Sequence, residues 1–281
     1  MYNFDFHRPA TIDEAIKLLK SAEDAKLLAG GQTLLPTMKQ RLAAPKSVID
    51  LGAVSGLSAI EHKGGSLVMS KAEGVPVLRG GTLTIGALAR HAEVAESPEV
   101  KQAIPALAAL AAGIGDPAVR NRGTIGGSIA NNDPAADYPA ACLGLGATIV
   151  TNKREIAADD FFKGLFETAL EPDEVILRIM FPAPGRAAYA KFRNPASRYA
   201  IVGVFVSERQ GSVRVAVTGA GQNGVFRVPE MEQVLAERFE PDAIRHVKID
   251  SANLVSDIHA AADYRAHLIG VMARRAVQTA A

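Results

Sequence analysis

Two Gly-Gly pairs, at residues 30–31 and 126–127, constrain the fold of this chain more than any other feature. The first lies in the sequence LAGGQTLL (residues 28–35), and the second opens the sequence TIGGSIANNDPAAD (residues 124–137). Glycine permits tight turns and leaves backbone N–H groups uncovered, so such segments can hold phosphate oxygens. Two of them in one chain predict that both close around the diphosphate of a dinucleotide.

The bulk composition narrows the class of protein. The chain has 281 residues, of which 48% are hydrophobic and 22% charged, as in a globular protein of two or three subdomains. A net charge of +1 provides no basic footprint for nucleic acid. The sequence has no apolar run near the roughly 20 residues of a membrane span. The first residues, MYNFDFH, do not resemble a secretory signal, so we expect no transmembrane segment and a cytoplasmic location, with a peripheral position at the inner face of the membrane as the alternative.

The cysteine and histidine content limits metal chemistry. Cys142 is the only cysteine, which excludes an internal disulfide and an iron–sulfur cluster held by this chain alone. Its apolar, helical surroundings predict a buried small side chain rather than a catalytic thiol. The six histidines form no close pair, and we expect no metal site.

The first 56 residues have the pattern of a small α/β unit. Thr11 and Glu14 form a capping box at the start of a helix over residues 11–20. A strand at 26–29 leads into the first glycine segment, followed by a helix over 34–42 and a strand at 47–51. The glycine segment then lies at the carboxyl end of a strand, a usual place for a ligand.

A second unit is predicted over residues 57–177. Its expected strands and helices, in chain order, are strands 57–61, 67–71 and 83–85, helices 87–95 and 98–112, a helix opened by Asp133-Pro134 and running to about Leu143, and strand 147–151. The part of the second helix from residue 106 to 112 is almost all alanine and leucine, which predicts that it is buried.

The remaining residues, 178–281, are predicted to form an antiparallel sheet with helices. The expected strands cover 187–194, 199–208 and 212–219, with a turn at Gln210-Gly211, and the expected helices cover 230–237 and 259–279. Residues 225–256 are weakly patterned. The predicted class is therefore α+β, with domains at 1–177 and 178–281 and a boundary around 176–186.

The first glycine segment can bind anions, but its pattern alone is weak evidence. A helix starting at Leu34 would add partial positive charge, and the Thr33 hydroxyl could donate a further hydrogen bond. The segment lacks the Gly-x-Gly-x-x-Gly pattern of nicotinamide-binding folds and the nucleotide-binding P-loop pattern. A simple strand–helix turn remains an alternative reading.

The second segment is richer in polar residues. Asp137 follows Asp133 by four residues, so both would lie on one face of the predicted helix. A carboxylate there could accept hydrogen bonds from the hydroxyls of a sugar or a ribitol chain. Asp133 could instead act only as the N-cap, whereas Asp137 lies beyond that position and is the stronger ligand candidate.

These two segments resemble the two FAD-binding motifs of the medium subunit of molybdenum hydroxylases, a family that includes aerobic carbon monoxide dehydrogenase and the flavin domain of xanthine dehydrogenase. The likeness extends over essentially the whole chain, including FHRP at residues 6–9, DFFKGLFETAL at 160–170 and YAKF at 189–192. It implies a two-part FAD-binding domain of the vanillyl-alcohol-oxidase (PCMH) type, followed by the C-terminal sheet.

The resemblance also implies site residues. Ala29, Gly30, Gly31, Gln32, Thr33 and Leu34, with Thr124, Ile125, Gly126, Gly127 and Ser128, would surround the FAD diphosphate. Asp137 would bond the sugar or ribitol, and Ile114 and Ile176 would line the flavin pocket. Lys191 would approach the carbonyl edge of the flavin ring, with Tyr189 nearby. The open alternatives are a solvated surface position for Lys191 and ordinary core positions for Ile114 and Ile176.

The sequence departs from the family pattern in three places. Thr33 stands where serine is frequent, which keeps the hydroxyl. The sequence PASRYA at 195–200 replaces a Gly-Asp or Asp-Ile step, which weakens any inference about the electron acceptor. The stretch from Leu67 to Leu83 is also longer than the family pattern predicts.

By the same resemblance, the chain would transfer electrons rather than act on a substrate. A large subunit with a molybdenum-pterin cofactor and a small subunit with two [2Fe–2S] clusters would complete the complex, as a dimer of heterotrimers that serves an external acceptor. The alternatives are a self-contained flavin oxidase or reductase, and an assembly module without cofactor.

Overall fold

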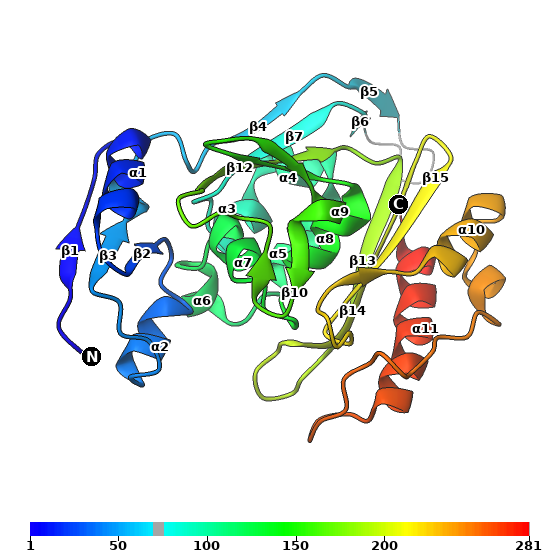
Figure 1. Cartoon of the computed structure of the whole chain (residues 1–281). Helices are drawn as coiled ribbons and strands as arrows, with labels where there is room; N and C mark the ends of the chain where they lie inside the picture. The colour runs from blue at the N-terminus through cyan, green and yellow to red at the C-terminus, as the bar shows by residue number, and fades with distance from the viewer. Residues whose placement is uncertain (70–75, 281) are drawn as a thin grey trace.

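The computed structural model describes residues 1–69 and 76–280. Figure 1 shows a small sheet with helices at the N-terminal end, a central sheet with a group of helices against it, and a C-terminal sheet with a long helix on its outer side. The predicted α+β class, with an antiparallel C-terminal sheet, is confirmed.

The N-terminal unit is a three-stranded parallel sheet in the order β1-β3-β2. Its elements are β1 (Asp5–His7), α1 (Ile12–Ser21), β2 (Ala25–Leu28), α2 (Leu34–Lys39), β3 (Ser47–Asp50) and the short 3₁₀ helix η1 (Leu51–Ala53). The predicted capping box is confirmed, because Thr11 Oγ1 accepts a hydrogen bond from the Glu14 N–H while the Glu14 carboxylate accepts from the Thr11 N–H. β2 ends at Leu28, the first residue of the first glycine segment.

The central unit contains a five-stranded antiparallel sheet in the order β4-β7-β12-β8-β9. Its strands are β4 (Ile60–Lys63), β7 (Thr82–Gly86), β8 (Thr148–Thr151), β9 (Glu155–Ala157) and β12 (Ile176–Pro182). Two hairpins accompany it, formed by β5 (Ser66–Met69) with β6 (Pro76–Arg79) and by β10 (Phe162–Gly164) with β11 (Glu167–Thr168). The strand predicted at 67–71 overlaps β5, and its last two residues lie outside the described part of the chain.

Seven helices of the central unit lie between its strands in sequence. They are α3 (His91–Glu96), α4 (Pro98–Ala103), α5 (Pro105–Ala112), α6 (Pro117–Arg120), α7 (Ile125–Asn131), α8 (Tyr138–Leu145) and α9 (Ala158–Phe161). All eight residues of α8 are buried, as expected for a helix that is apolar on every side. The predicted burial near residues 106–112 is confirmed for α5.

Three of the predicted helices in this unit are wrong in their bounds. The helix predicted over 87–95 begins only at His91, as α3. The helix predicted over 98–112 is broken at Ile104, which precedes Pro105 and has a non-helical backbone (φ −143°, ψ 74°). The helix predicted to start at Asp133-Pro134 does not form there. Asn132 ends α7 in the left-handed conformation (φ 44°), and the next helix begins at Tyr138. Asp133 and Asp137 therefore do not share a helix face.

The C-terminal unit is a four-stranded antiparallel sheet in the order β13-β14-β15-β16. Its elements are β13 (Arg186–Arg193), β14 (Ala200–Arg209), β15 (Ser212–Thr218), β16 (Phe226–Arg227), α10 (Pro229–Glu237), the 3₁₀ helix η2 (Pro241–Ile244) and α11 (Ala262–Thr279). The predicted turn at Gln210-Gly211 is confirmed, with φ values of +53° and +83°.

Helices cover both faces of this last sheet. Phe205 of β14 belongs to the core that contains α5 and α8, whereas its neighbours Val204 and Val206 belong to the core that contains α11. Eight consecutive residues of β14 are buried for this reason. Figure 1 shows α11 on the outer side of the sheet.

The end of strand β12 can be compared with the domain boundary predicted from the sequence. It pairs with β7 and β8 as far as Pro182, so the chain leaves the central sheet after that residue rather than after residue 177. This position lies inside the 176–186 interval, and the division into domains itself stays a prediction. Among the described residues, no helix combines the length and apolar character needed to cross a membrane.

Candidate functional site

The two glycine segments lie against each other. A Cβ atom placed on Gly30 would fall 2.0 Å from the carbonyl oxygen of Arg122 and 2.8 Å from the Cα atom of Gly123. Only glycine fits such a contact with main chain on the opposite side. On the next residues, a Cβ atom placed on Gly127 would lie 3.8 Å from the Cβ atom of Ala29. The predicted meeting of the two segments is therefore confirmed, while the diphosphate between them stays a prediction.

The first segment offers free backbone donors. Gly31 has a φ of +72°, which turns the chain from β2 toward α2. Within the described residues, no hydrogen bond engages the N–H groups of Gly31, Gln32 or Thr33, and the Thr33 hydroxyl makes no capping bond. Consecutive free N–H groups in such a turn form a concavity that binds anions. The first segment thus has the donors that a phosphate group requires.

Three N–H groups of the second segment, those of Ile125, Gly126 and Gly127, are already hydrogen-bonded, so the sequence prediction of free N–H groups is wrong at these residues. Thr124 is the N-cap of α7, and its hydroxyl accepts a hydrogen bond from the Gly127 N–H at 3.1 Å. The N–H groups of Ile125 and Gly126 donate to the carbonyl oxygens of Ala89 and Ala87. These two hydrogen bonds hold the start of α7 against the segment between β7 and α3. What α7 can offer a ligand is side-chain groups and the positive end of its dipole.

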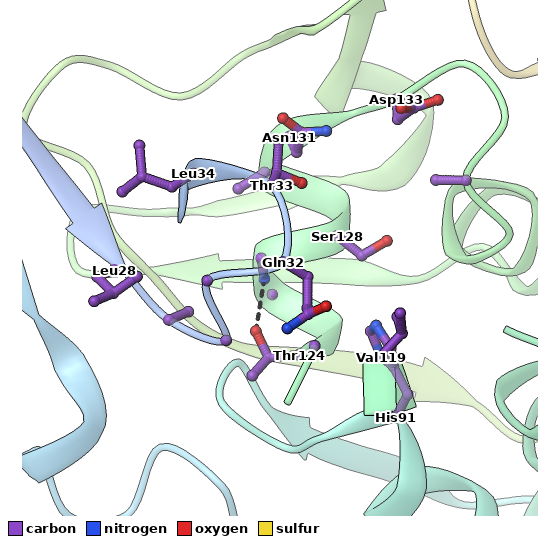
Figure 2. A pocket seen from close by; sticks show the side chains of 18 of the residues that line it. Leu28, Gln32, Thr33, Leu34, His91, Val119, Thr124, Ser128, Asn131 and Asp133 are labelled. Carbon is purple, nitrogen blue, oxygen red and sulfur yellow. Dashed lines mark hydrogen bonds between the residues drawn. The ribbon is translucent and has the colours of Figure 1, made fainter. Parts of the chain in front are cut away.

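A cavity of about 900 Å³ opens between the two segments, near the top of the size range of small-molecule sites. Figure 2 shows Gln32 and Thr33 of the first segment opposite Ser128 and Asn131 of α7 and the N-cap residue Thr124. Neither Ser128 nor Asn131 makes a side-chain hydrogen bond within the described part of the chain, so both are available to a ligand. The predicted residues that line the cavity are Ala29, Gly30, Gly31, Gln32, Thr33, Leu34, Ile114, Thr124, Gly126, Gly127, Ser128, Asp137 and Ile176.

Two predicted residues do not line it. Ile125 is fully buried in the core below α7. Lys191 lies behind the cavity wall, where its Nζ atom donates to Oδ2 of Asp137 at 2.9 Å and to the carbonyl oxygen of Gly113 at 3.0 Å. The alternative of a solvated Lys191 is wrong, because its side chain is 5% exposed. Whether it approaches a flavin ring stays a prediction.

Asp137 is held from behind by two side chains. Its Oδ1 atom accepts a hydrogen bond from the Tyr189 hydroxyl, and its Oδ2 atom accepts from Lys191. Burial raises the pKa of the Asp137 carboxyl, and the charge of Lys191 opposes that rise. Two side chains of β13 therefore fix the orientation of this carboxylate at the edge of the cavity. Its contact with a sugar or ribitol stays a prediction, and it would use the acceptor positions that Tyr189 and Lys191 leave open.

His91 adds an unsatisfied polar atom to the cavity wall. Within the described residues its Nδ1 atom is buried without a hydrogen-bond partner. Burial lowers the pKa of His91 to about 4, and the nearby Arg120 charge acts in the same direction. The imidazole is therefore neutral near pH 7. An orphaned buried polar atom beside a cavity is a common mark of a ligand site.

The loop between β13 and β14 forms a wall that the sequence did not predict. Ala196, Ser197, Arg198 and Tyr199 line the cavity. Asn194 shapes this loop, because its Oδ1 atom accepts from the N–H groups of Ala196 and Ser197. Tyr199 is half exposed, and burial together with the charges of Asp133 and Asp137 raises its pKa. The Asn-Pro step at 194–195 was the available signal for this turn.

An ion pair between the buried Glu174 and the half-exposed Arg154 supports the wall beside Ile176. The side chain of Glu174 is fully buried and accepts hydrogen bonds from Thr151 at 2.7 Å and Arg154 at 3.0 Å. Burial alone would raise the pKa of Glu174, but the bonds from Arg154, the Glu171 N–H and Thr151 lower it to about 2. Glu174, Val175 and Ile176 are thereby fixed along one side of the cavity.

Comparison with known proteins identifies the family. A family model described as the FAD binding domain in molybdopterin dehydrogenase matches residues 2–72 and 76–184. The chain belongs to this family. Its relatives include the nicotine 6-hydroxylase medium subunit of Paenarthrobacter nicotinovorans, which is 36% identical over 96% of this chain and 94% of its own length. The carbon monoxide dehydrogenase medium chain of Hydrogenophaga pseudoflava is 33% identical over 99% of this chain and 96% of its own.

The solved structures agree with this assignment. Carbon monoxide dehydrogenase from Hydrogenophaga pseudoflava superposes with a TM-score of 0.81 at 33% identity, over 99% of this chain and 96% of that chain. Quinoline 2-oxidoreductase from Pseudomonas putida 86 superposes with a TM-score of 0.80 at 28% identity, over 99% and 96%. This member of the molybdopterin dehydrogenase FAD-binding family is therefore similar to medium chains of oxidoreductase complexes along its whole length.

The described cavity fits the FAD of this family. The first glycine segment supplies free N–H groups, the contact at Gly30 admits no side chain, and His91 and Asn131 supply polar groups without protein partners. No group of three or more His, Cys, Asp or Glu residues in the described ranges is arranged to hold a metal ion.

Proposed function

We propose that this chain is the FAD-carrying electron-transfer subunit of a molybdenum hydroxylase complex. In this assignment a large subunit holds the molybdenum-pterin cofactor, and a small subunit holds the [2Fe–2S] clusters that supply electrons. The observation that carries the proposal is the contact of the two glycine segments at Gly30 beside one cavity of about 900 Å³. The similarity to medium chains over 96% to 99% of this chain supports it.

The residues of this chain bind and orient the cofactor. The N–H groups of residues 31–33 and the hydroxyls of Thr33 and Ser128 hold the diphosphate, and Ile114 and Ile176 form apolar walls for the ring. Lys191 and Tyr189 keep the Asp137 carboxylate in one orientation. When bound, FAD can take up electrons singly and deliver them in pairs. The single cysteine, Cys142, is buried in α8, so the iron–sulfur clusters belong to a partner.

The cofactor assignment is tested by the flavin content of purified protein. We expect the native chain to show a bound-flavin spectrum and Gly127→Asp to lose it, because the added carboxylate would lie between Thr124 and Ala29. Gly270→Asp is the matched control, since a Cβ atom there meets no atom within 4 Å. If Gly127→Asp fails to fold, the pair Thr33→Val and Ser128→Ala tests the same contacts by weakened FAD affinity. Full FAD content in all three variants would contradict the assignment.

The electron-transfer role is tested by separating the chain from its partners. The FAD-loaded chain alone should accept electrons from a chemical reductant but turn over no organic substrate. Turnover by the isolated chain would instead favour the alternative of a self-contained flavin oxidase or reductase. Genes for a molybdopterin-binding large subunit and a ferredoxin-like small subunit next to this one would support the proposed complex.

Three finer points belong to the same proposal. The complex would be a dimer of heterotrimers, which the mass of the assembled complex tests. The external electron acceptor would approach the cavity mouth near the 194–199 loop, because this loop forms an outer wall with the half-exposed Tyr199. The cytoplasmic location expected from the sequence stays a prediction.

A further inference from the structure

A second cleft lies on the outer side of the C-terminal unit. It has a volume of about 300 Å³ and runs between α11 and the segment that follows η2. Figure 1 shows α11 at the opposite end of the molecule from the three-stranded sheet. The cleft shares no lining residue with the candidate FAD cavity. The two sites are therefore separate, and an inference about this cleft does not depend on the proposed function.

Cationic side chains converge on this cleft from both walls. Arg245 and Lys248 come from the segment after η2, and Arg274 comes from α11. Within the described residues, none of the three forms an ion pair or a side-chain hydrogen bond. The single carboxylate of α11, Asp263, does not line the cleft. Like charges that line one cleft without a lining carboxylate repel each other, so this arrangement favours an anion from outside.

Gly270 keeps the floor of the cleft open. It lies in the interior of α11, where glycine is less stable than alanine. Its backbone is not in the left-handed region, and a Cβ atom there would meet no atom within 4 Å. Neither backbone conformation nor protein packing requires glycine at this position. Its effect is to leave the helix surface between His267 and Arg274 uncovered.

Apart from His267 of α11, the other lining groups are apolar. Ile244 and Val247 belong to the wall opposite α11. A cavity of this size suits a small molecule rather than a folded segment of a partner. Arginine forks recognise phosphate oxygens in pairs, and two arginines on opposite walls can bind one group from both sides.

We propose that this cleft binds a small phosphorylated anion. Arg245 and Arg274 bind its phosphoryl oxygens from opposite walls, Lys248 adds charge, and the apolar part packs on Ile244 and Val247. Binding would link the segment after η2 to α11. The class comprises inorganic pyrophosphate and small organic phosphates, and comparison of pyrophosphate with a sugar phosphate at equal ionic strength distinguishes the two.

The test is calorimetric titration of pyrophosphate into the 281-residue chain saturated with FAD, so that the other cavity is filled. We expect saturable binding to one site at 0.15 M salt, roughly physiological ionic strength. Arg274→Gln and Arg245→Gln should each weaken it about tenfold, as for a lost hydrogen bond to a charged group. Arg275→Gln is the matched control, because Arg275 is exposed on the same helix but does not line the cleft.

A steric variant tests the position of the ligand without removing charge. Gly270→Leu should fill the cleft and abolish pyrophosphate binding, while the melting temperature stays equal or rises because leucine favours helix. Absence of saturable binding to the native chain would overturn the proposal. So would unchanged affinity in Gly270→Leu or in both arginine variants. Loss of the site in the assembled complex would also overturn it, because the cations would then serve a partner subunit.

Discussion

Lys191 and Asp137 form an ion pair of 2.9 Å in which both side chains are only 5% exposed. The pair joins β13 to the residue that precedes α8. The bond from Lys191 to the carbonyl oxygen of Gly113 extends the connection to the loop that holds Ile114. One ammonium group therefore ties two segments of the cavity wall, at Ile114 and Asp137, to β13 behind them.

Replacing Lys191 by methionine should destabilise the protein strongly. The variant leaves the Asp137 carboxyl buried without its cation, and such a loss lowers the free energy of unfolding by about 3–5 kcal/mol. Urea denaturation measures it. Lys17→Met is the control, since Lys17 is exposed without an ion pair among the described residues, and its change should be within about 0.5 kcal/mol. The double variant Asp137→Asn/Lys191→Met should recover part of the loss, and a Lys191→Met protein as stable as native would disprove a dry ion pair.

We expect the free energy of unfolding to decrease at acidic pH because of the Glu174 carboxyl. Its folded pKa is about 2, against an ordinary value of 4.5. A carboxyl with a lowered folded pKa stabilises the protein fully above its unfolded pKa, and the contribution is lost as the pH falls from about 4.5 to 2. Unfolding measured across that range should show a slope that Glu174→Gln reduces. Glu230→Gln, at an exposed glutamate without an ion pair in the described ranges, should keep the native slope. Equal slopes in all three proteins would refute the assignment.

Because of the contact at Gly30, we expect that even a single methyl group added at this residue disrupts the packing of the two segments. Gly30→Ala would place a Cβ atom 2.0 Å from the Arg122 carbonyl oxygen, and no rotamer change relieves a clash with main chain. The segments must move apart, at a cost of about 1–3 kcal/mol, and FAD affinity should fall. Gly270→Ala is the control, and it should stabilise the protein by about 1 kcal/mol because its Cβ atom meets open space. Normal FAD affinity in Gly30→Ala would show that the segments need not touch.

Cys142 should react with thiol reagents only after unfolding. The side chain is fully buried in α8, and burial raises the pKa of its thiol, so little thiolate is present at neutral pH. A chromogenic disulfide reagent should detect no thiol in native protein and one per chain in denaturant. Rapid reaction of the native protein would mean that α8 opens readily, because all eight of its residues are buried in the structure.

Local patterns predicted most of the secondary structure. The capping box at Thr11 and the turn at Gln210-Gly211 depend on neighbouring residues, and both are present. Pro105 could have revealed the break at Ile104, since the residue before proline avoids the helical region. The helix start predicted at Asp133-Pro134 was wrong because Asn132 ends α7 in the left-handed conformation. The Asp133 side chain instead accepts a hydrogen bond from the Ala135 N–H and forms a turn.

The site was predictable only where chain neighbours form it. Residues 29–34 are adjacent in sequence and line the cavity together. The local sequence pointed to Asp137 and the resemblance to Lys191, but their ion pair joins positions 54 residues apart, and spacing carries no information about such contacts. The hydrogen bonds of the Ile125 and Gly126 N–H groups could not be predicted either, because their acceptors are the carbonyl oxygens of Ala89 and Ala87, more than 30 residues earlier in the chain. Tertiary contacts thus decided which backbone donors stay free.

The two-sided burial of β14 has a consequence for any attempt to divide this polypeptide. A fragment that starts at β13 would leave Phe205 and Ala216 facing water, because α5 and α8 normally shield them. A fragment that stops before β13 would lack Phe205 and Ala216, and the residues of α8 that pack in the same core would be exposed to water. We therefore expect neither piece to fold alone, although the pairing of β12 with β7 ends at Pro182. During synthesis α8 emerges first and must wait for the last hundred or so residues, so truncation from either end should yield aggregation rather than a smaller working protein.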